Sequence, residues 1–280
     1  MSFAWRAAVF TLVTFSVSLP LTAQEQPEPD PQEQAWQILQ GGLQDRKASN
    51  RTVAVQALSL LPGNRRATSF ALSALSDKSP EVRAAAAVVL GQQHARAAIP
   101  ALKQALNDSE IPVALAAAHS LFLFKDPSAY EVYYAVLMGD RKSSVGLVQS
   151  QINRLKDPKQ VAQIGFEEGI GFVPFGGMGY EAYRTIHKND GSPVRASAAR
   201  FLANDPDPMT EDALIQTALA DKDEGVRLAA LDALTQRGDP HCVPRLVKNL
   251  SDDERSAVRY RSAAVILHLS ALGKKPRKPN

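Results

Sequence analysis

The chain has 280 residues, with 32 Lys and Arg against 29 Asp and Glu, and its formal net charge is +3 at pH 7. A charge this close to balance argues against nucleic acid as a partner, because domains that bind DNA or RNA concentrate basic residues. The single cysteine, Cys242, excludes an intramolecular disulfide. Stability must therefore come from burial of apolar side chains, even in an oxidising compartment.

The first 23 residues have the pattern of a secretory signal peptide. Arg6 is the only charge, residues 7–19 form an apolar run, and Ala23 is a small residue directly before Gln24. The run is shorter than the roughly 20 residues that span a bilayer. We therefore expect cleavage between Ala23 and Gln24, export to a periplasm or the exterior, and no stable membrane insertion afterwards. Retention as an uncleaved anchor is the alternative, because Leu21 is not the usual small residue three positions before cleavage.

Both ends of the mature chain lack apolar residues. The stretch QEQPEPDPQEQ, residues 24–34, is polar, acidic and rich in proline, a composition that cannot bury area and predicts a disordered spacer. We place this spacer at residues 24–31 and the folded part at residues 32–272. The basic stretch GKKPRKPN, residues 273–280, is expected to be a solvated tail.

A repeat of about 32 residues organises the folded part. It is anchored on an Asp or Asn that is followed five residues later by Val and six residues later by Arg in most units. The anchors are Asp45, Asp77, Asp108, Asp140, Asn189, Asp221 and Asp253, at intervals of 32, 31, 32, 49, 32 and 32 residues. The fourth interval is too long by about 17 residues, which predicts one insertion.

Each unit carries the apolar pattern of two helices. Nine residues past the anchor lies a small residue in six units: Ala54, Ala86, Ala117, Ala198, Ala230 and Ser262. Thirteen residues past it lies a large aliphatic residue: Leu58, Leu90, Leu121, Leu202, Leu234 or Ile266. The pairs Ser79 with Pro80 and Ser192 with Pro193 predict helix starts, with an N-cap before proline.

Units of this kind cannot bury an apolar face alone, so they must stack as a solenoid. No strand pattern is present. We predict an all-α, right-handed solenoid of six to seven helical hairpins. The segment EQAWQILQGGLQD before Asp45 is expected to be a lone helix that caps the stack with Trp36.

The units EVRAAAAVVLG...AIPALKQALND and GVRLAALDALTQRGDPHCVPRLVKNLSDD resemble HEAT repeats of the short type named for phycobilisome lyases, and the resemblance covers roughly residues 32–272. It is specific for architecture and weak for function. In that family the repeated Asp and Arg form a ladder of charged contacts between neighbouring units. The resemblance implies the same role for Asp45, Arg51, Asp77, Arg83, Asp221, Arg227, Asp253 and Arg259. The ladder has a gap, because Ala114 and Gly146 replace Arg in units three and four.

No catalytic constellation is present. HEAT-like deoxyhypusine hydroxylases hold iron with His-Glu dipeptides, but no histidine here precedes Glu. His241 and Cys242 are adjacent, so their side chains diverge, and no second pair lies at zinc spacing. There is no serine elbow of the GxSxG kind. We therefore expect no metal, no cofactor and no enzymatic activity.

The inserted stretch GIGFVPFGGMGY, residues 169–180, lies within an insert at about residues 165–188. It lacks the Lys and Ser or Thr of a phosphate loop. One interpretation is that it plugs the stack beside the irregular fourth unit, and the other is that it forms a recognition site. The candidate partner-binding residues are aromatic: Tyr133, Tyr134, Phe172, Phe175, Tyr180 and Tyr183.

The sequence thus predicts an exported, non-catalytic scaffold that binds a protein partner, whose identity it does not give, and it leaves the oligomeric state open. The alternative is an enzyme, or an enzyme subunit of the oxidoreductase or lyase type, with its site at residues 169–183.

Overall fold

A computed structural model describes residues 30–129 and 192–273, and these two blocks contain helices and no β-strand. The N-terminal block contains α1 (Pro31–Leu43), α2 (Ala48–Ala57), η1 (Leu58–Leu60), α3 (Arg65–Ala74), α4 (Pro80–Gln92), η2 (Arg96–Ala98), α5 (Ile99–Ala105) and α6 (Ile111–Leu123). The C-terminal block contains α11 (Ser192–Phe201), η4 (Leu202–Asn204), α12 (Pro208–Ala220), α13 (Glu224–Arg237), η5 (Pro240–Cys242), α14 (Val243–Leu246), α15 (Lys248–Asp252) and α16 (Ser256–Gly273). None of these helices combines the length and the apolar character needed to cross a bilayer.

The first helix begins earlier than the sequence predicted. Asp30 caps α1 by accepting a hydrogen bond from the backbone of Gln32 at 3.1 Å, and Pro31 occupies the first turn. A capping carboxylate followed by proline is a strong start signal. Pro31 therefore belongs to the helix and not to the spacer, while residues 32–34 are helical and lie in the part that was predicted to fold.

The start of α4 falls at Pro80, directly after Ser79, as predicted. The capping detail differs, because the Ser79 side chain makes no hydrogen bond to the helix backbone. Its hydroxyl bonds to the Glu81 carboxylate instead. At the other end of a helix, Gly238 terminates α13 in the left-handed conformation, with φ at 71°, which glycine adopts without strain.

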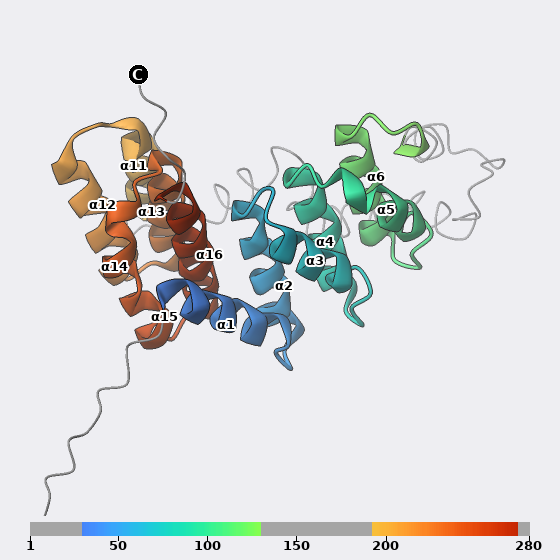
Figure 1. The fold of residues 1–280 in the computed structure, drawn as a ribbon, viewed down its shortest axis with the longest axis horizontal. Coiled ribbons are helices and arrows are strands. Elements are labelled where there is room, and N and C mark those ends of the chain that lie inside the picture. Colours follow the sequence, from blue (N-terminus) through green and yellow to red (C-terminus); the bar gives the residue numbers. More distant parts are fainter. Residues whose placement is uncertain (1–29, 130–191, 274–280) are drawn as a thin grey trace, which may run out of the picture.

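The helices form two layers (Figure 1). One layer is a row in which successive members pack against each other, in the order α11, α13, α16, α2, α4 and α6. The second layer lies along this row and contains α12, α14 with α15, α1, α3 and α5. This is the all-α solenoid of helical hairpins that the repeat predicted.

The order of the row differs from the order of the sequence. The last helix, α16, packs against α1 and α2, so the C-terminal block precedes the N-terminal block in space (Figure 1). We call this contact of α16 with α1 and α2 the seam. The prediction that residues before Asp45 cap the stack is wrong, because α1 lies inside the stack and packs against both α16 and α2. Trp36 is buried beside Phe70 of α3, with 6.1 Å between the ring centroids.

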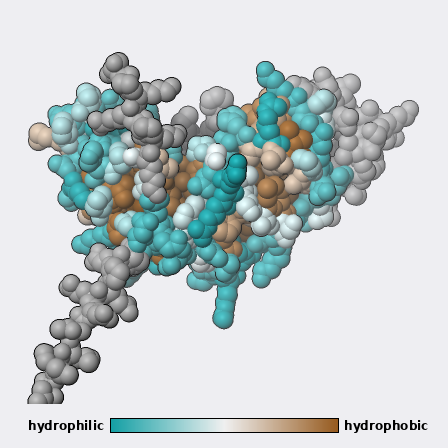
Figure 2. Space-filling view, viewed as in Figure 1, coloured by the Kyte–Doolittle hydropathy of each residue, from teal (hydrophilic) through white to brown (hydrophobic). Residues whose placement is uncertain are grey.

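The repeated small and aliphatic positions form the core. Ala54, Ala86, Ala117 and Ala230 are fully buried, and so are their aliphatic partners one turn later. Unit five is the exception, since Ala198 is exposed and Leu202 is only half-buried. Both belong to the α11 hairpin at the end of the row, where no described helix covers them. Figure 2 shows polar residues over most of one face, with apolar residues visible between the helices.

Several predictions concern residues outside the described blocks. They are the signal peptide, the spacer up to Pro29, the insert at about residues 165–188, and the tail from residue 274 onward.

Candidate protein-binding surface

Arg51 and Asp77 form a bidentate ion pair between the first and second units. Arg51 donates from Nε and Nη2 to the two Asp77 carboxylate oxygens, each at 2.7 Å. A third donor, Nη1, reaches the backbone carbonyl of Asp45 at 2.9 Å. Only 7% of the Arg51 side chain and 15% of the Asp77 side chain are exposed. The hydrogen bond from Arg51 lowers the pKa of the Asp77 carboxyl below its usual value.

The same geometry recurs along the row. Arg83 donates to both carboxylate oxygens of Asp108, at 2.7 and 2.8 Å, and Arg195 donates to those of Asp221, at 3.0 and 3.2 Å. Two parallel charge-assisted hydrogen bonds fix orientation as well as distance. The Arg of one unit therefore sets the position of the Asp in the next unit.

Arg227 makes the last of these junctions in a more buried setting. It pairs with Asp253, donates to Asn249 at 3.2 Å, and donates from Nε to the carbonyl of Ala218 at 2.8 Å. Only 9% of the Arg227 side chain and 3% of the Asp253 side chain are exposed. All three partners are acceptors, so the buried guanidinium is well compensated.

The two end members of the ladder, Asp45 and Arg259, are not joined to each other in the described blocks. The Asp45 carboxylate accepts from the Asn50 side chain at 3.0 Å and from the Lys47 backbone at 2.7 Å. Arg259 interacts with Tyr260, and its Nε is buried with no hydrogen-bond partner among the described residues. The ladder therefore does not extend across the seam.

Exposed large apolar side chains lie at the two ends of the row. At one end Phe122 and Leu123, in the last turn of α6, are 45% and 41% exposed. At the other end Phe201 of α11 is 85% exposed and Met209 of α12 is 77% exposed. Exposed apolar groups of this size mark contact surfaces when they gather in a patch. Sequence reasoning did not single out these four residues, because single apolar residues near helix ends give no periodic signal.

A polar cavity of about 280 Å³ lies beside the turns that join α11 to α12 and α13 to α14. It is lined by Ala203, Asn204, Asp205, Pro206, Glu211, Gln236, Arg237 and Asp239. Burial raises the pKa of Glu211, and the Asp239 carboxylate adds to the effect. Arg237 donates to the backbone carbonyls of Leu202 and Asp207 at 3.4 and 3.3 Å. Its guanidinium therefore holds the turn together, while its Nε is buried without a hydrogen-bond partner among the described residues.

The neighbouring His241 and Cys242 do not form a reactive pair. His241 is exposed, and its Nδ1 lies 2.7 Å from an oxygen of Asp239. Cys242 is 1% exposed, and burial raises the pKa of its thiol to about 12. A thiol with this pKa carries almost no thiolate at neutral pH, which is the form that reacts. Within residues 30–129 and 192–273, no group of three or more His, Cys, Asp or Glu side chains is placed to hold a metal ion.

The remaining candidate site residues lie outside the described blocks. The partner-binding aromatics Tyr133, Tyr134, Phe172, Phe175, Tyr180 and Tyr183 belong to residues 130–191, and the cleavage residues Ala23 and Gln24 precede α1.

The HEAT repeat family model matches this chain over residues 68–143 and 185–266, which together make up more than half of its length. The chain therefore belongs to the HEAT-repeat family. Its row of hairpins and its Arg–Asp ladder agree with this assignment.

Two solved structures match this chain at low sequence identity. One is the complex of CpcE and CpcF of phycocyanin lyase from Nostoc sp. PCC7120, with 19% identity, a TM-score of 0.33, and coverage of 90% of this chain and 99% of that chain. The other is human deoxyhypusine hydroxylase in complex with glycerol, with 17% identity, a TM-score of 0.31, and coverage of 85% and 84%. No curated protein matches this chain.

Proposed function

We propose that this protein is an exported, non-catalytic HEAT-repeat scaffold that binds another protein. The observation that carries the proposal is the position of the exposed apolar side chains. Leu123 precedes and Phe201 follows the segment of the sequence that contains the six candidate aromatic residues. Apolar and aromatic residues are enriched in the buried centre of protein interfaces. Exposed apolar side chains at both ends of the row, together with the aromatic residues that lie between them in the sequence, suit a protein partner.

The rigidity of the stack supports a binding role. Arg–Asp pairs fix successive units, as in the pair of Arg83 with Asp108. A rigid surface loses little conformational freedom when it binds, and this lowers the cost of association. The scaffold would therefore present its partner surface in one geometry.

Export is supported by the leader sequence described above. Intact-mass measurement of protein purified from its native host is expected to give a chain that begins at Gln24. A full-length chain that retains residues 1–23 in the cytoplasm would contradict export.

Partner binding is tested by capture from the envelope of the source organism, with the wild-type chain and with Phe201→Ala as bait. A matched control is Gln216→Ala, which changes an exposed polar residue on α12. We expect Phe201→Ala to lower the yield of at least one captured protein about tenfold and the control to leave it unchanged. Equal yields from all three baits would show that Phe201 is not part of the binding surface.

The non-catalytic part of the proposal has its own test. Elemental analysis of the purified protein is expected to find no stoichiometric iron or zinc. One tightly bound metal ion per chain would favour the enzyme alternative instead.

A further inference from the structure

The seam joins parts of the chain that are far apart in the sequence. Ser256 of α16 donates from its hydroxyl to the Asn50 side chain of α2 at 3.0 Å, across a separation of 206 residues. The covalent connection between the two blocks, residues 130–191, joins α6 to α11 at the opposite ends of the row (Figure 1). The helices that meet at the seam are therefore not consecutive in the sequence, since the chain runs from α2 to α16 by way of α6 and α11.

The surfaces at the seam are specific for each other. The ring of Tyr260 on α16 lies so close to Gly42 of α1 that a Cβ on Gly42 would fall 2.6 Å from the ring. The same Cβ would fall 2.9 Å from the Cβ of Ala54 on α2. Because only glycine fits this position, the ring of Tyr260 has a site shaped for it.

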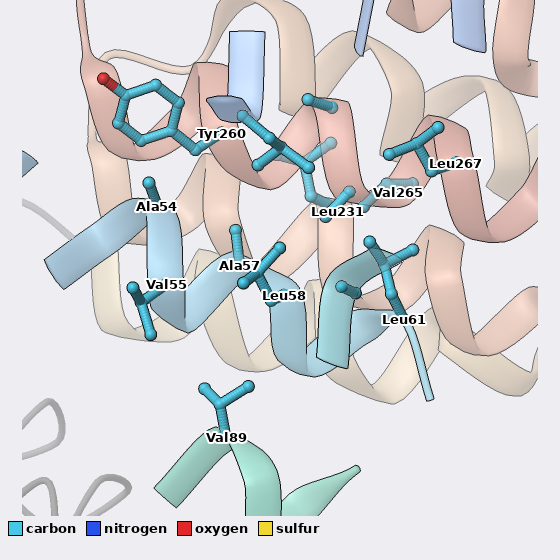
Figure 3. Close-up of a cluster of buried hydrophobic side chains, with 14 of the residues drawn as sticks. Ala54, Val55, Ala57, Leu58, Leu61, Val89, Leu231, Tyr260, Val265 and Leu267 are labelled. Carbon is cyan, nitrogen blue, oxygen red and sulfur yellow. The ribbon is translucent and has the colours of Figure 1, made fainter. Parts of the chain in front are cut away.

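Apolar side chains fill the rest of the seam. Figure 3 shows Tyr260 and Val265 of α16 on one side and Ala54, Ala57 and Leu58 of the N-terminal block on the other. All of these residues are at most 4% exposed. A continuous buried core of this kind is typical of an interior and not of a loose contact between separate bodies.

The seam lacks the ion pair that joins the other described junctions. An Arg–Asp pair joins unit one to unit two and unit two to unit three. Similar pairs join unit five to unit six and unit six to unit seven. At the seam Arg259 occupies the Arg position and Asp45 the Asp position, and they do not pair. Apolar packing and the hydrogen bond from Ser256 to Asn50 contribute to the seam. Among the described residues, no Arg–Asp pair has to separate when the seam opens.

We propose that the seam is an exchangeable interface, through which a second copy of this chain binds by placing its residues 30–129 against residues 192–273 of the first copy. Every copy carries both complementary surfaces, Gly42 with Ala54 on one block and Tyr260 on the other. When each copy places its residues 30–129 against residues 192–273 of the other copy, two seams form between the chains. The result is a closed dimer, as in domain swapping. The intramolecular seam closes a loop of about 200 residues, and the entropy cost of closure grows with loop length.

The proposal is tested with two full-length variants that carry different affinity tags, Asn50→Cys in one and Ser256→Cys in the other. The two are co-expressed, purified through both tags in succession, and treated with a short bis-maleimide. We expect a covalent dimer of about twice the 30.3 kDa of one chain that bears both tags. Its yield should exceed that of each single variant alone at least fivefold. Buried Cys242 should not react, so the wild-type chain is the control for background.

Three outcomes of the cross-linking experiment would overturn the proposal, and sedimentation gives a fourth. The tags do not co-purify, or they co-purify without a cross-link, which places any association elsewhere. The third is that the double variant Asn50→Cys with Ser256→Cys cross-links within one chain while the mixed sample shows no dimer. Sedimentation of the wild-type chain needs no variant to fold, and a single monomer at every concentration up to about 100 µM would also contradict exchange.

Discussion

Tyr260, near the C-terminal end of the chain, packs its ring against Gly42, near the N-terminal end, with room for no side chain larger than hydrogen at residue 42. Tyr260 is 4% exposed and Ala54 is fully buried, so neither can move aside easily. This contact decides how the two blocks are placed, because it lies where α1, α2 and α16 meet.

We expect Gly42→Ala to destabilise the protein by about 1–3 kcal/mol, because an added methyl in a well-packed core forces its neighbours to shift. Gly41→Ala is the matched control, since a Cβ at residue 41 has no atom within 4 Å. Alanine is a better helix former than glycine, so this variant should gain up to about 1 kcal/mol. The free energy of unfolding, from urea titrations of both variants, checks the prediction. Equal effects of the two changes would mean that the seam does not form in solution.

The ladder gives a second prediction. Arg51→Ala and Arg83→Ala should each cost about 1–3 kcal/mol, because each leaves a partly buried carboxylate without its hydrogen-bond donors. The control is Arg245→Ala, because Arg245 pairs with Asp212 while their side chains are 42% and 67% exposed. Exposed ion pairs contribute little, and this change should stay within about 0.5 kcal/mol. Thermal or urea unfolding compares the three variants, and similar losses for all of them would show that burial of the pair does not matter.

The lowered pKa of Asp77 predicts how stability depends on pH. Because Arg51 holds the pKa of this carboxyl below its unfolded value of about 3.9, the pair stabilises the fold fully above that value. Its contribution is lost as the pH falls through the folded pKa. Asp77→Asn lacks this contribution at every pH. The difference in unfolding free energy between wild type and Asp77→Asn should therefore be largest above pH 5 and shrink below pH 4. A difference that stays constant from pH 6 to pH 2.5 would contradict the assignment, and Asp212→Asn, at an exposed pair, serves as the control.

The sequence predicted the helical hairpins well, since their signals are local. Alanine nine residues past the anchor and leucine one turn later mark the buried side of a helix, and Ala86 with Leu90 lies there. The Asp and Arg also recur in most units, so the pairing of Arg51 with Asp77 could be expected from the family resemblance.

The seam could not be predicted in the same way. Gly42 and Tyr260 lie in different units, share no spacing, and look like an ordinary helical glycine and an ordinary core aromatic. The order of the units in space depends on which helix surfaces at the ends of the two blocks fit each other. The 32-residue spacing of the anchors would be the same whichever ends came together. Asn50 and Ser256 are among the residues that determine this fit. Neither is found at the same position of every unit, so an alignment of the repeats does not reveal them.

The last prediction concerns Cys242, the only thiol of the chain. In the folded protein it should not react with a disulfide reagent at pH 8, because it is 1% exposed and burial raises the pKa of the thiol to about 12. With that pKa only about one thiol in ten thousand is ionised at pH 8, against roughly one in four at a pKa of 8.5. Reaction therefore requires local opening of the turn that packs Cys242 beside α16. Gln216→Cys, on the exposed face of α12, is the control and should react within the mixing time.

Labelling should become faster in Gly42→Ala, because a weakened seam releases α16 and the turn beside it. If the wild-type thiol reacts as fast as the control, Cys242 is accessible in solution. If Gly42→Ala labels at the wild-type rate, the C-terminal block keeps its packing without the seam.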